Sequence, residues 1–438
     1  MAWPAIPNGN VANTLAVLHQ LESSQWLPAE ALRQNQFRQL ELVLRHAYAS
    51  SPYYRERWAA DFDPALPLTA ERFAALPLLS RRELQAHFDA LKCRSVPPHG
   101  GVGEAITTGS TGTPVRVLKT ELCLLLWDVF TLRAEVWHRR DLGGKFAMIR
   151  HGMPEGEFDN WGRATRGLAA TGPLVVLGIE HEVSAQLAWL ELQQPDYLMT
   201  HPSLLAELLK QSSAGGKRLA RLREVRAFGE PVTPDLRALC REVWGVPIVD
   251  AYSATEVGYM ALQCPEHEHY HVQSEDVLVE VLDEGGRRCG PGEIGRVVVT
   301  TLHNFAMPLV RYDIGDYAEP GEACPCGRGL PVLRRIVGRV RNMLVTAEGK
   351  RFWVGLGSGT LPRIAPIRQY QFVQKELDLV EAHLVAAVPL TVEQEDRVRA
   401  HVLKQLPPGF RVRVVYRDNI PRGAGGKFED FHSELAVA

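Results

Sequence analysis

The sequence lacks a long hydrophobic run, a strong excess of one charge and the paired cysteines of a disulfide scaffold. No stretch of about 18 consecutive apolar residues is present, so we expect no membrane-spanning helix and no membrane partner. The formal net charge of −2 gives no electrostatic case for binding nucleic acid. The seven cysteines are an odd number, and the N-terminal segment lacks the basic and apolar regions of a secretory signal. We therefore expect a cytoplasmic protein.

The chain contains enough apolar sequence for a large core. Its 438 residues would form two or three domains, with a hydrophobic content, 45%, that is ordinary for a globular protein. Strand-length apolar segments alternate with segments of helical periodicity, which predicts βα units and a largely parallel sheet. Strands are expected at residues 145–149, 174–179, 197–200, 225–228 and 247–252. Helices are expected at residues 121–140, 183–193, 204–210 and 234–244. Ligands bind such sheets at the carboxyl ends of the strands.

The pattern changes after residue 277, where short strands are joined by glycine-rich turns. Strands at residues 277–282, 294–302 and 308–312 predict an antiparallel part, appended as a β-barrel. Beyond it, strands at 369–373, 380–388 and 411–416 and a helix at 393–403 predict a small α+β domain. The predicted fold class is α/β, with a large multi-layer domain at 1–337, a hinge at 338–342 and a small domain at 343–438.

A hydroxyl-rich segment, Thr-Thr-Gly-Ser-Thr-Gly-Thr-Pro, occupies residues 107–114 and precedes a predicted strand at 115–117. Hydroxyl and backbone N–H groups surround phosphate oxygens, and glycine allows the backbone to approach a ligand closely. We interpret this segment as a loop for nucleotide phosphates, and the alternative is a polar surface turn. A P-loop phosphotransferase is disfavoured, because Gly112 is followed by Thr113 and Pro114 rather than by lysine.

Three further segments carry residue types suited to a nucleotide site. In Tyr-Ser-Ala-Thr-Glu, Tyr252 could stack on a base, while Thr255 and Glu256 could reach a phosphate and its Mg²⁺. Asp316 follows a glycine and suits the hydroxyls of a ribose, although a turn aspartate is the alternative. Lys427 ends a glycine-rich segment and could bring its charge onto a phosphate, the alternative being a solvated lysine.

Cysteine and histidine gather in two segments. Cys264 begins Cys-Pro-Glu-His-Glu-His-Tyr-His, and Cys324 and Cys326 form a Cys-Pro-Cys-Gly turn further along the chain. Three thiolates and one imidazole would complete a closed, structural zinc site, whereas the alternative is a set of reduced, unpaired cysteines. A zinc-dependent nucleic-acid-binding module is disfavoured, since no cluster of arginine and lysine accompanies these segments.

Taken in order, these segments resemble those of the adenylate-forming superfamily, which contains acyl- and aryl-coenzyme A synthetases, luciferases and peptide-synthetase adenylation domains. The resemblance is greatest to the phenylacetate–coenzyme A ligase-like branch and spans nearly the whole chain. The ordered series of motifs is what makes it specific: residues 107–114, Gly229-Glu230, residues 252–256, Asp316, Gly338-Arg339 and Lys427.

The resemblance implies an ATP/AMP site and a role for each motif. The ATP phosphates would be held by Thr108, Gly109, Ser110, Thr111 and Gly112. Gly229 and Glu230 would line the adenine pocket, and Tyr252 would stack on the base. Asp316 and Arg339 would hold the ribose.

The remaining roles implied by the resemblance concern catalysis and metals. Thr255 would contact the α-phosphate, Glu256 would bind Mg²⁺, and Lys427 would contact both the α-phosphate and the carboxylate substrate during adenylation. In this branch the zinc pattern matches Cys264, His271, Cys324 and Cys326, with His267 and His269 as competing imidazoles.

The function implied is ATP-dependent activation of a carboxylic acid, by default an aryl or arylacetic acid, to an acyl-adenylate with release of pyrophosphate. Transfer to a thiol follows, with coenzyme A as the expected acceptor and a carrier protein or an amine as alternatives. A homodimer and a ligase that binds nucleotide without turnover also stay open, although Glu256, Asp316 and Lys427 argue against the latter. The chain departs from the family at Asn342, where the hinge usually carries an acidic residue or lysine, and at residues 345–350, which replace a glycine-rich segment.

Overall fold

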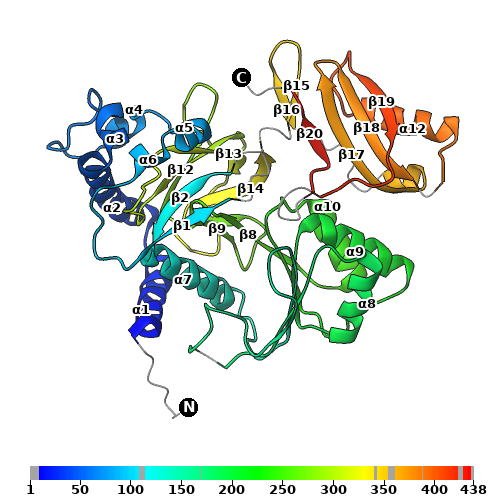
Figure 1. The fold of residues 1–438 in the computed structure, drawn as a ribbon, viewed down its shortest axis with the longest axis horizontal. Helices are drawn as coiled ribbons and strands as arrows, with labels where there is room; N and C mark the ends of the chain where they lie inside the picture. Colours follow the sequence, from blue (N-terminus) through cyan, green and yellow to red (C-terminus); the bar gives the residue numbers. More distant parts are fainter. Residues whose placement is uncertain are drawn as a thin grey trace.

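The computed structural model describes residues 9–107, 114–168, 170–339, 343–353, 361–386, 388–422 and 428–435. It confirms the predicted α/β fold, with a large mixed sheet and a smaller sheet near the C-terminus (Figure 1). The helices are α1 (Gly9–Ser24), α2 (Ala29–Ser50), α3 (Pro52–Arg57), α4 (Ala70–Ala75), α5 (Arg81–Ala86), α6 (Phe88–Leu91), α7 (Glu121–Trp137), α8 (Val183–Gln193), α9 (Pro202–Ala214), α10 (Pro234–Trp244), α11 (Leu361–Ile364) and α12 (Val392–Leu403).

The strands of the large sheet are β3 (Phe146–Ile149), β4 (Gly156–Phe158), β5 (Leu174–Leu177), β6 (Tyr197–Thr200), β7 (Glu224–Ala227), β8 (Ile248–Ala254), β9 (Gly258–Gln263), β10 (Tyr270–Val272), β11 (Val277–Leu282), β12 (Gly295–Thr301), β13 (Tyr312–Pro320) and β14 (Val332–Arg339). The other strands are β1 (Val102–Ile106), β2 (Arg116–Thr120), β15 (Met343–Val345), β16 (Arg351–Trp353), β17 (Ile367–Glu376), β18 (Leu379–Ala386), β19 (Arg411–Tyr416) and β20 (Phe431–Ser433).

The parallel part of the large sheet has the βα alternation that the sequence predicts. Strands β5, β3, β6, β7 and β8 pair in parallel, and leucines of α8 and α9 pack into the core beside them. Helix α10 shows which residues allow the ends of a helix to be predicted from the sequence. Thr233 accepts a hydrogen bond from the amide of Leu236, Pro234 stands in the first turn, and Gly245 ends the helix with φ of +74°.

The antiparallel part continues the same sheet in the order β11-β12-β13-β14-β10-β9 and joins the parallel part through the pair of β9 and β8. The predicted strand at 308–312 is wrong, because β13 begins only at Tyr312. Pro308 has no N–H to donate, and Arg311 adopts a φ of +48°, so the extended backbone is interrupted there. The closure of these strands into a barrel stays a prediction.

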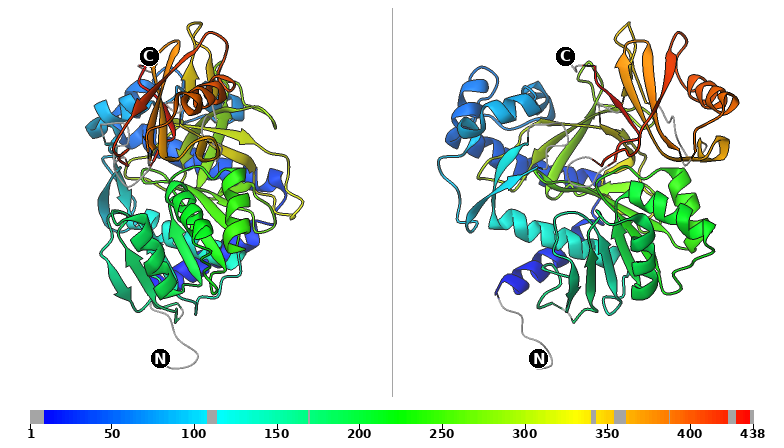
Figure 2. Two further views of the ribbon diagram at one scale, coloured as in Figure 1. Left: turned by 90° about the vertical axis from the view of Figure 1, so that its right-hand side faces the viewer. Right: turned by 45° about the vertical axis from the view of Figure 1, so that its right-hand side comes forward.

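The C-terminal sheet, defined as β17 to β20, has the order β19-β18-β17-β20, and α12 packs against it. Figure 2 shows this sheet, coloured orange to red, beside helices α8 to α10, which are green.

Gly338 and Arg339, which the sequence placed in a hinge, form the end of β14 in the large sheet. The domain boundaries themselves stay a prediction. None of the described helices combines the length and the hydropathy needed to cross a bilayer.

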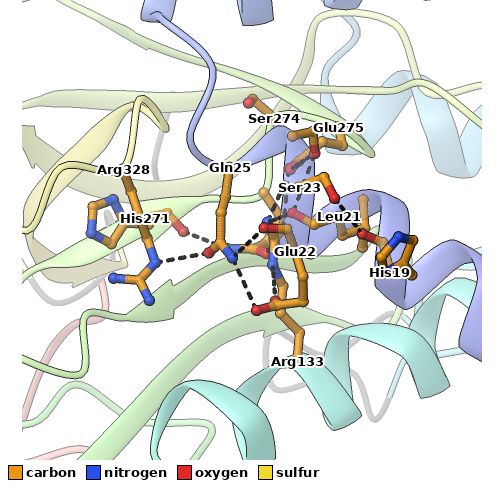
Figure 3. Close-up of polar contacts among 12 residues, drawn as sticks. His19, Leu21, Glu22, Ser23, Gln25, Arg133, His271, Ser274, Glu275 and Arg328 are labelled. Atoms are coloured by element: carbon orange, nitrogen blue, oxygen red, sulfur yellow. Dashed lines mark hydrogen bonds and ion pairs between the residues drawn. The ribbon is translucent and has the colours of Figure 1, made fainter.

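A fully buried arginine ties the N-terminal helix to the large sheet. Arg133 on α7 donates to the carbonyl oxygen of Leu21 at 2.8 Å and to Gln273 Oε1 at 2.8 Å, and its Nη2 is 3.0 Å from Glu275 Oε1. Figure 3 shows Glu22 and Glu275 gathered around it. Since the guanidinium is removed from water, these partners supply the hydrogen bonds and the opposite charge that it would otherwise lack.

We predict that Arg133→Leu lowers the free energy of unfolding by about 3–5 kcal/mol, because it removes the cation paired with Glu275 and one donor each to Leu21 and Gln273. The matched control is Arg45→Leu, which breaks the exposed pair with Glu41 and should cost less than about 1 kcal/mol. Denaturant titration of both variants provides the comparison. Equal losses in the two variants would contradict the role given to Arg133.

Candidate functional site

The candidate nucleotide residues gather along one edge of the large sheet. Glu230 follows β7, Tyr252 lies in β8, Asp316 in β13 and Arg339 at the end of β14. The register of β13 and β14 places Asp316 directly opposite Arg339. Strand pairing therefore brings Asp316 to Arg339, and a side-chain hydrogen bond brings Tyr252, 64 positions earlier in the sequence, to Asp316.

The Asp316 carboxylate is the centre of a three-residue contact. The hydroxyl of Tyr252 donates to Asp316 Oδ2 at 2.8 Å, and Arg339 Nε lies 3.2 Å from Asp316 Oδ1. Burial and then the negative charge of Asp316 raise the pKa of Tyr252 well above its usual value. Tyr252 therefore keeps its proton and remains a donor to the carboxylate.

Glu256 lies in the turn between β8 and β9, where it is almost fully buried, whereas its neighbour Thr255 is exposed. The ion pair that Glu256 forms with Arg81 is long, with Arg81 Nη1 at 3.9 Å from Glu256 Oε1. Burial acts to lower the pKa of Arg339, but the carboxylates of Asp316 and then Glu256 hold that pKa above its usual value. A buried carboxylate so weakly bound by side-chain cations suits a divalent cation.

Glu230 accepts hydrogen bonds from two distant parts of the chain. The amide of Ser203, at the start of α9, donates to Oε2 at 2.8 Å, and the Ser203 hydroxyl donates to Oε1 at 3.0 Å. The amide of Phe428 donates to Oε1 at 2.7 Å. Burial raises the pKa of Glu230 although these donors act to lower it. Gly229 precedes it with φ of +78°, a conformation that favours glycine.

Two predicted segments fall outside the described residues. These are the loop residues Thr108, Gly109, Ser110, Thr111 and Gly112, together with the segment that contains Lys427. The hinge residue Asn342 also lies outside them. The residues beside the loop are described: the amide of Thr107 donates to the carbonyl of Val115 at 2.9 Å, and the amide of Val115 donates to Thr107 Oγ1 at 2.9 Å.

The predicted metal ligands Cys264, His271, Cys324 and Cys326 form one group, whose ligand atoms all lie within 4.8 Å of one another. Around a tetrahedral zinc ion two thiolate sulfurs would be about 3.8 Å apart, and a sulfur and an imidazole nitrogen about 3.6 Å apart. Cys264 Sγ is 3.8 Å from Cys324 Sγ, and Cys326 Sγ is 3.4 Å from His271 Nε2. The donor set and its spacing therefore fit zinc.

The surroundings of this group favour the ligand form of two of its members, His271 and Cys326, whereas burial raises the pKa of the Cys264 and Cys324 thiols. Burial, and then the neighbouring His269, lower the pKa of His271 to about 4, so the imidazole is neutral. Arg328 Nη1 donates to Cys326 Sγ at 3.4 Å, and Arg328 Nε donates to Gln25 Oε1 at 2.8 Å. Figure 3 shows Gln25 lying between Arg328 and Glu22. His267 does not belong to the group and stacks on His269 with ring centroids 5.2 Å apart.

The sequence did not indicate Arg81, Ser203, Arg328 or Phe428 as site residues. The Ser80–Glu83 capping box marks the start of α5, but nothing in it shows that Arg81 faces Glu256. Phe428 contributes its backbone amide, which every residue except proline possesses, so the residue type carries no signal.

The chain is similar to known proteins in sequence and in fold. Residues 166–307 match the family of AMP-binding enzymes. The chain is 28% identical over 339 residues to phenylacetate–coenzyme A ligase of Pseudomonas putida, which covers 75% of each chain. It is 28% identical over 380 residues to the ligase of the same name from Thermus thermophilus, covering 83% of this chain and 82% of the relative.

Among solved structures, 2-hydroxyisobutyryl-CoA ligase in the postadenylation state, in complex with R3-HIB-AMP, superposes with a TM-score of 0.74. The identity is 19%, and the match covers 94% of this chain and 91% of that one, so this likeness concerns the fold. Together the matches confirm the predicted resemblance to adenylate-forming enzymes and the predicted enzyme class, an AMP-forming ligase.

We predict that Tyr252→Phe lowers the free energy of unfolding by about 1.5–3 kcal/mol, because a hydrogen bond to a charged, buried carboxylate is lost. Tyr259→Phe is the matched control, since its hydroxyl shares only a 3.4 Å contact with Thr131 Oγ1 and should cost about 1 kcal/mol or less. Denaturant titration measures both. A loss for Tyr259→Phe as large as that for Tyr252→Phe would contradict the importance of the Asp316 contact.

Proposed function

We propose that this protein uses ATP to activate a carboxylic acid as an acyl-adenylate and then transfers the acyl group to the thiol of coenzyme A. One observation carries the proposal: the amide of Phe428, the residue after Lys427, is hydrogen-bonded to Glu230, which follows β7, the strand that pairs with the Tyr252 strand β8. A basic residue near the C-terminus is thus joined to the neighbourhood of the candidate nucleotide site.

The nucleotide would lie along this edge. We propose that Asp316 and Arg339 bind the ribose, since each carboxylate oxygen has a second lone pair beyond those used by Tyr252 and Arg339. Tyr252 would contact the base, and Gly229 and Glu230 would border it. The loop residues Thr108, Gly109, Ser110, Thr111 and Gly112 would hold the phosphates, with Thr255 at the α-phosphate.

Glu256 would hold a magnesium ion, because its carboxylate is buried and only distantly paired with Arg81. When bound, such a cation neutralises charge on the phosphate oxygens. Arg81 and Arg339 would add positive charge on the same side. We propose that these residues orient the nucleotide before the reaction begins.

In the adenylation step, a carboxylate oxygen of the substrate attacks the α-phosphorus of ATP. The new bond replaces the bond to the β-phosphate oxygen, and pyrophosphate leaves. Negative charge grows on the α-phosphate, where the ammonium group of Lys427 would stabilise it. In the second step the thiol attacks the acyl carbon and AMP leaves. A rotation of the part after residue 342, about a hinge at 338–342, would separate the two steps.

The substrate and acceptor are proposed from the relatives. Both curated relatives are phenylacetate–coenzyme A ligases, which supports an aryl or arylacetic acid as substrate and coenzyme A as acceptor. We place the enzyme in the cytoplasm, because its seven cysteines form no disulfide and cytoplasmic thiols stay reduced.

We also propose a structural zinc ion held by Cys264, His271, Cys324 and Cys326. All four positions are filled by the protein, so no site for a reacting water is left, as in closed structural sites. The ion would join the loop after β9 to the segment between β13 and β14.

Incubation of the wild-type protein with ATP and phenylacetate should release pyrophosphate and form AMP. Formation of ADP would contradict the proposed function.

Lys427→Ala should lower acid-dependent ATP–pyrophosphate exchange by about 100-fold or more, because one donor to the developing charge is lost. The control is Lys404→Ala, at the exposed end of α12, which should exchange at the wild-type rate. An unimpaired Lys427→Ala variant would remove this lysine from the chemistry.

Metal analysis of the purified protein should give about one equivalent of zinc. Cys324→Ser should lose it and unfold at a lower temperature, since ligand binding then no longer stabilises the fold. Cys289→Ser is the control, because Cys289 lies outside the ligand group and should retain the metal. A stable wild-type protein that contains no zinc would defeat this part of the proposal.

A further inference from the structure

The Glu230 junction, defined here as Ser203, Glu230, Arg422 and Phe428, joins the large sheet to the segment that leads into the C-terminal strand. Besides the bonds from Ser203 and Phe428 to Glu230, Arg422 Nη1 donates to Ser203 Oγ at 2.6 Å. The Arg422 guanidinium also lies 5.9 Å from the centre of the Phe428 ring. Arg422 is therefore bound to Ser203 on α9, Phe428 is bound to Glu230 after β7, and the Arg422 and Phe428 side chains lie against each other.

The contacts form a chain of donors and acceptors in which every role is set. The Ser203 hydroxyl donates to Glu230 and accepts from Arg422, while the Ser203 amide donates to the other Glu230 oxygen. Since the carboxylate is charged and half-buried, each of these hydrogen bonds is costly to lose. Since Arg422 is positively charged, it also offsets the charge of Glu230 across Ser203.

We propose that Ser203 and Glu230 are positioning residues for adenylation, holding Arg422 and the Phe428 amide so that Lys427 reaches the reacting phosphate. The inference rests on the proposed function. Lys427 is bonded covalently to Phe428, so fixing the Phe428 amide limits the distance over which its ammonium group can act. Glu230 would therefore position the segment that contains Lys427, in addition to lining the adenine pocket as expected from the sequence.

The same geometry predicts that the junction acts in one half-reaction only. Its bonds cross from the large sheet to the C-terminal segment, so any rotation of the C-terminal sheet large enough to withdraw Lys427 also breaks them. The junction therefore stabilises the arrangement in which the acyl-adenylate forms. It contributes nothing to attack by the thiol once that rotation has taken place.

The test compares the two half-reactions in Glu230→Gln. The glutamine carbonyl can still accept one bond, but its NH₂ group faces a donor, either the Ser203 amide or the Phe428 amide. ATP–pyrophosphate exchange should fall about 10- to 100-fold, as expected for losing a hydrogen bond to a charged group. Thioester formation from preformed acyl-adenylate and coenzyme A should stay within about twofold. Ser203→Ala should show the same selectivity with a smaller loss.

Glu191→Gln is the matched control, because the Glu191 carboxylate on α8 forms an ion pair with Lys217, outside the Glu230 junction. It should leave both half-reactions unchanged. Hydrogen exchange gives a readout independent of activity: peptides containing the Phe428 amide should exchange faster in Glu230→Gln than in the wild-type protein.

Equal losses in both half-reactions, or weakened AMP binding with an unchanged exchange rate at Phe428, would overturn the inference and leave Glu230 as a nucleotide-pocket residue. If the wild-type protein shows no pyrophosphate exchange with any acid, the proposed function fails, while hydrogen exchange at Phe428 still reports on the junction.

Discussion

The hydrogen bond between the Phe428 amide and the Glu230 carboxylate is the contact on which the arrangement of the site depends. It joins residues 198 positions apart and connects the edge of the large sheet to the segment that leads into the C-terminal sheet. Glu230 is half-buried, and donors to its carboxylate replace the water that it loses, because an unpaired charge removed from water is costly. Because the Phe428 amide is one of these donors, the hydrogen bond to Glu230 also limits where the segment around Phe428 can lie.

The Asp316 carboxylate follows the same principle at the other end of the candidate nucleotide site. It lies between the Tyr252 hydroxyl, which donates to one carboxylate oxygen, and the Arg339 guanidinium beside the other, so its orientation is set. The predicted metal ligands lie further along the antiparallel strands, and Arg328 connects Cys326 through Gln25 to the N-terminal helix. Arg133 then joins that helix to the residues after β10, so the metal group and α1 belong to one buried polar network (Figure 3).

Much of this could be predicted from local sequence. The bounds of α8, β6 and α10 agree with the predicted ones, because caps, proline and glycine mark helix ends and apolar runs mark buried strands. The strand at 308–312 was wrong because a positive φ at Arg311 is imposed by tertiary contacts, not by its residue type. Ser203, Arg422 and the Phe428 amide could not be predicted, since their roles arise from pairing between distant segments and, for Phe428, from a backbone group.

The central claim is that the nucleotide is bound where the C-terminal segment contacts the Glu230 and Asp316 edge. The most direct measurement is a crystal structure of the protein with an unreactive analogue of the acyl-adenylate. The account predicts that the ribose contacts Asp316 and Arg339, that Lys427 faces the phosphate and that the Phe428 amide remains on Glu230. An analogue bound elsewhere, with no contact to Asp316 and with Lys427 directed away from its phosphate, would contradict it.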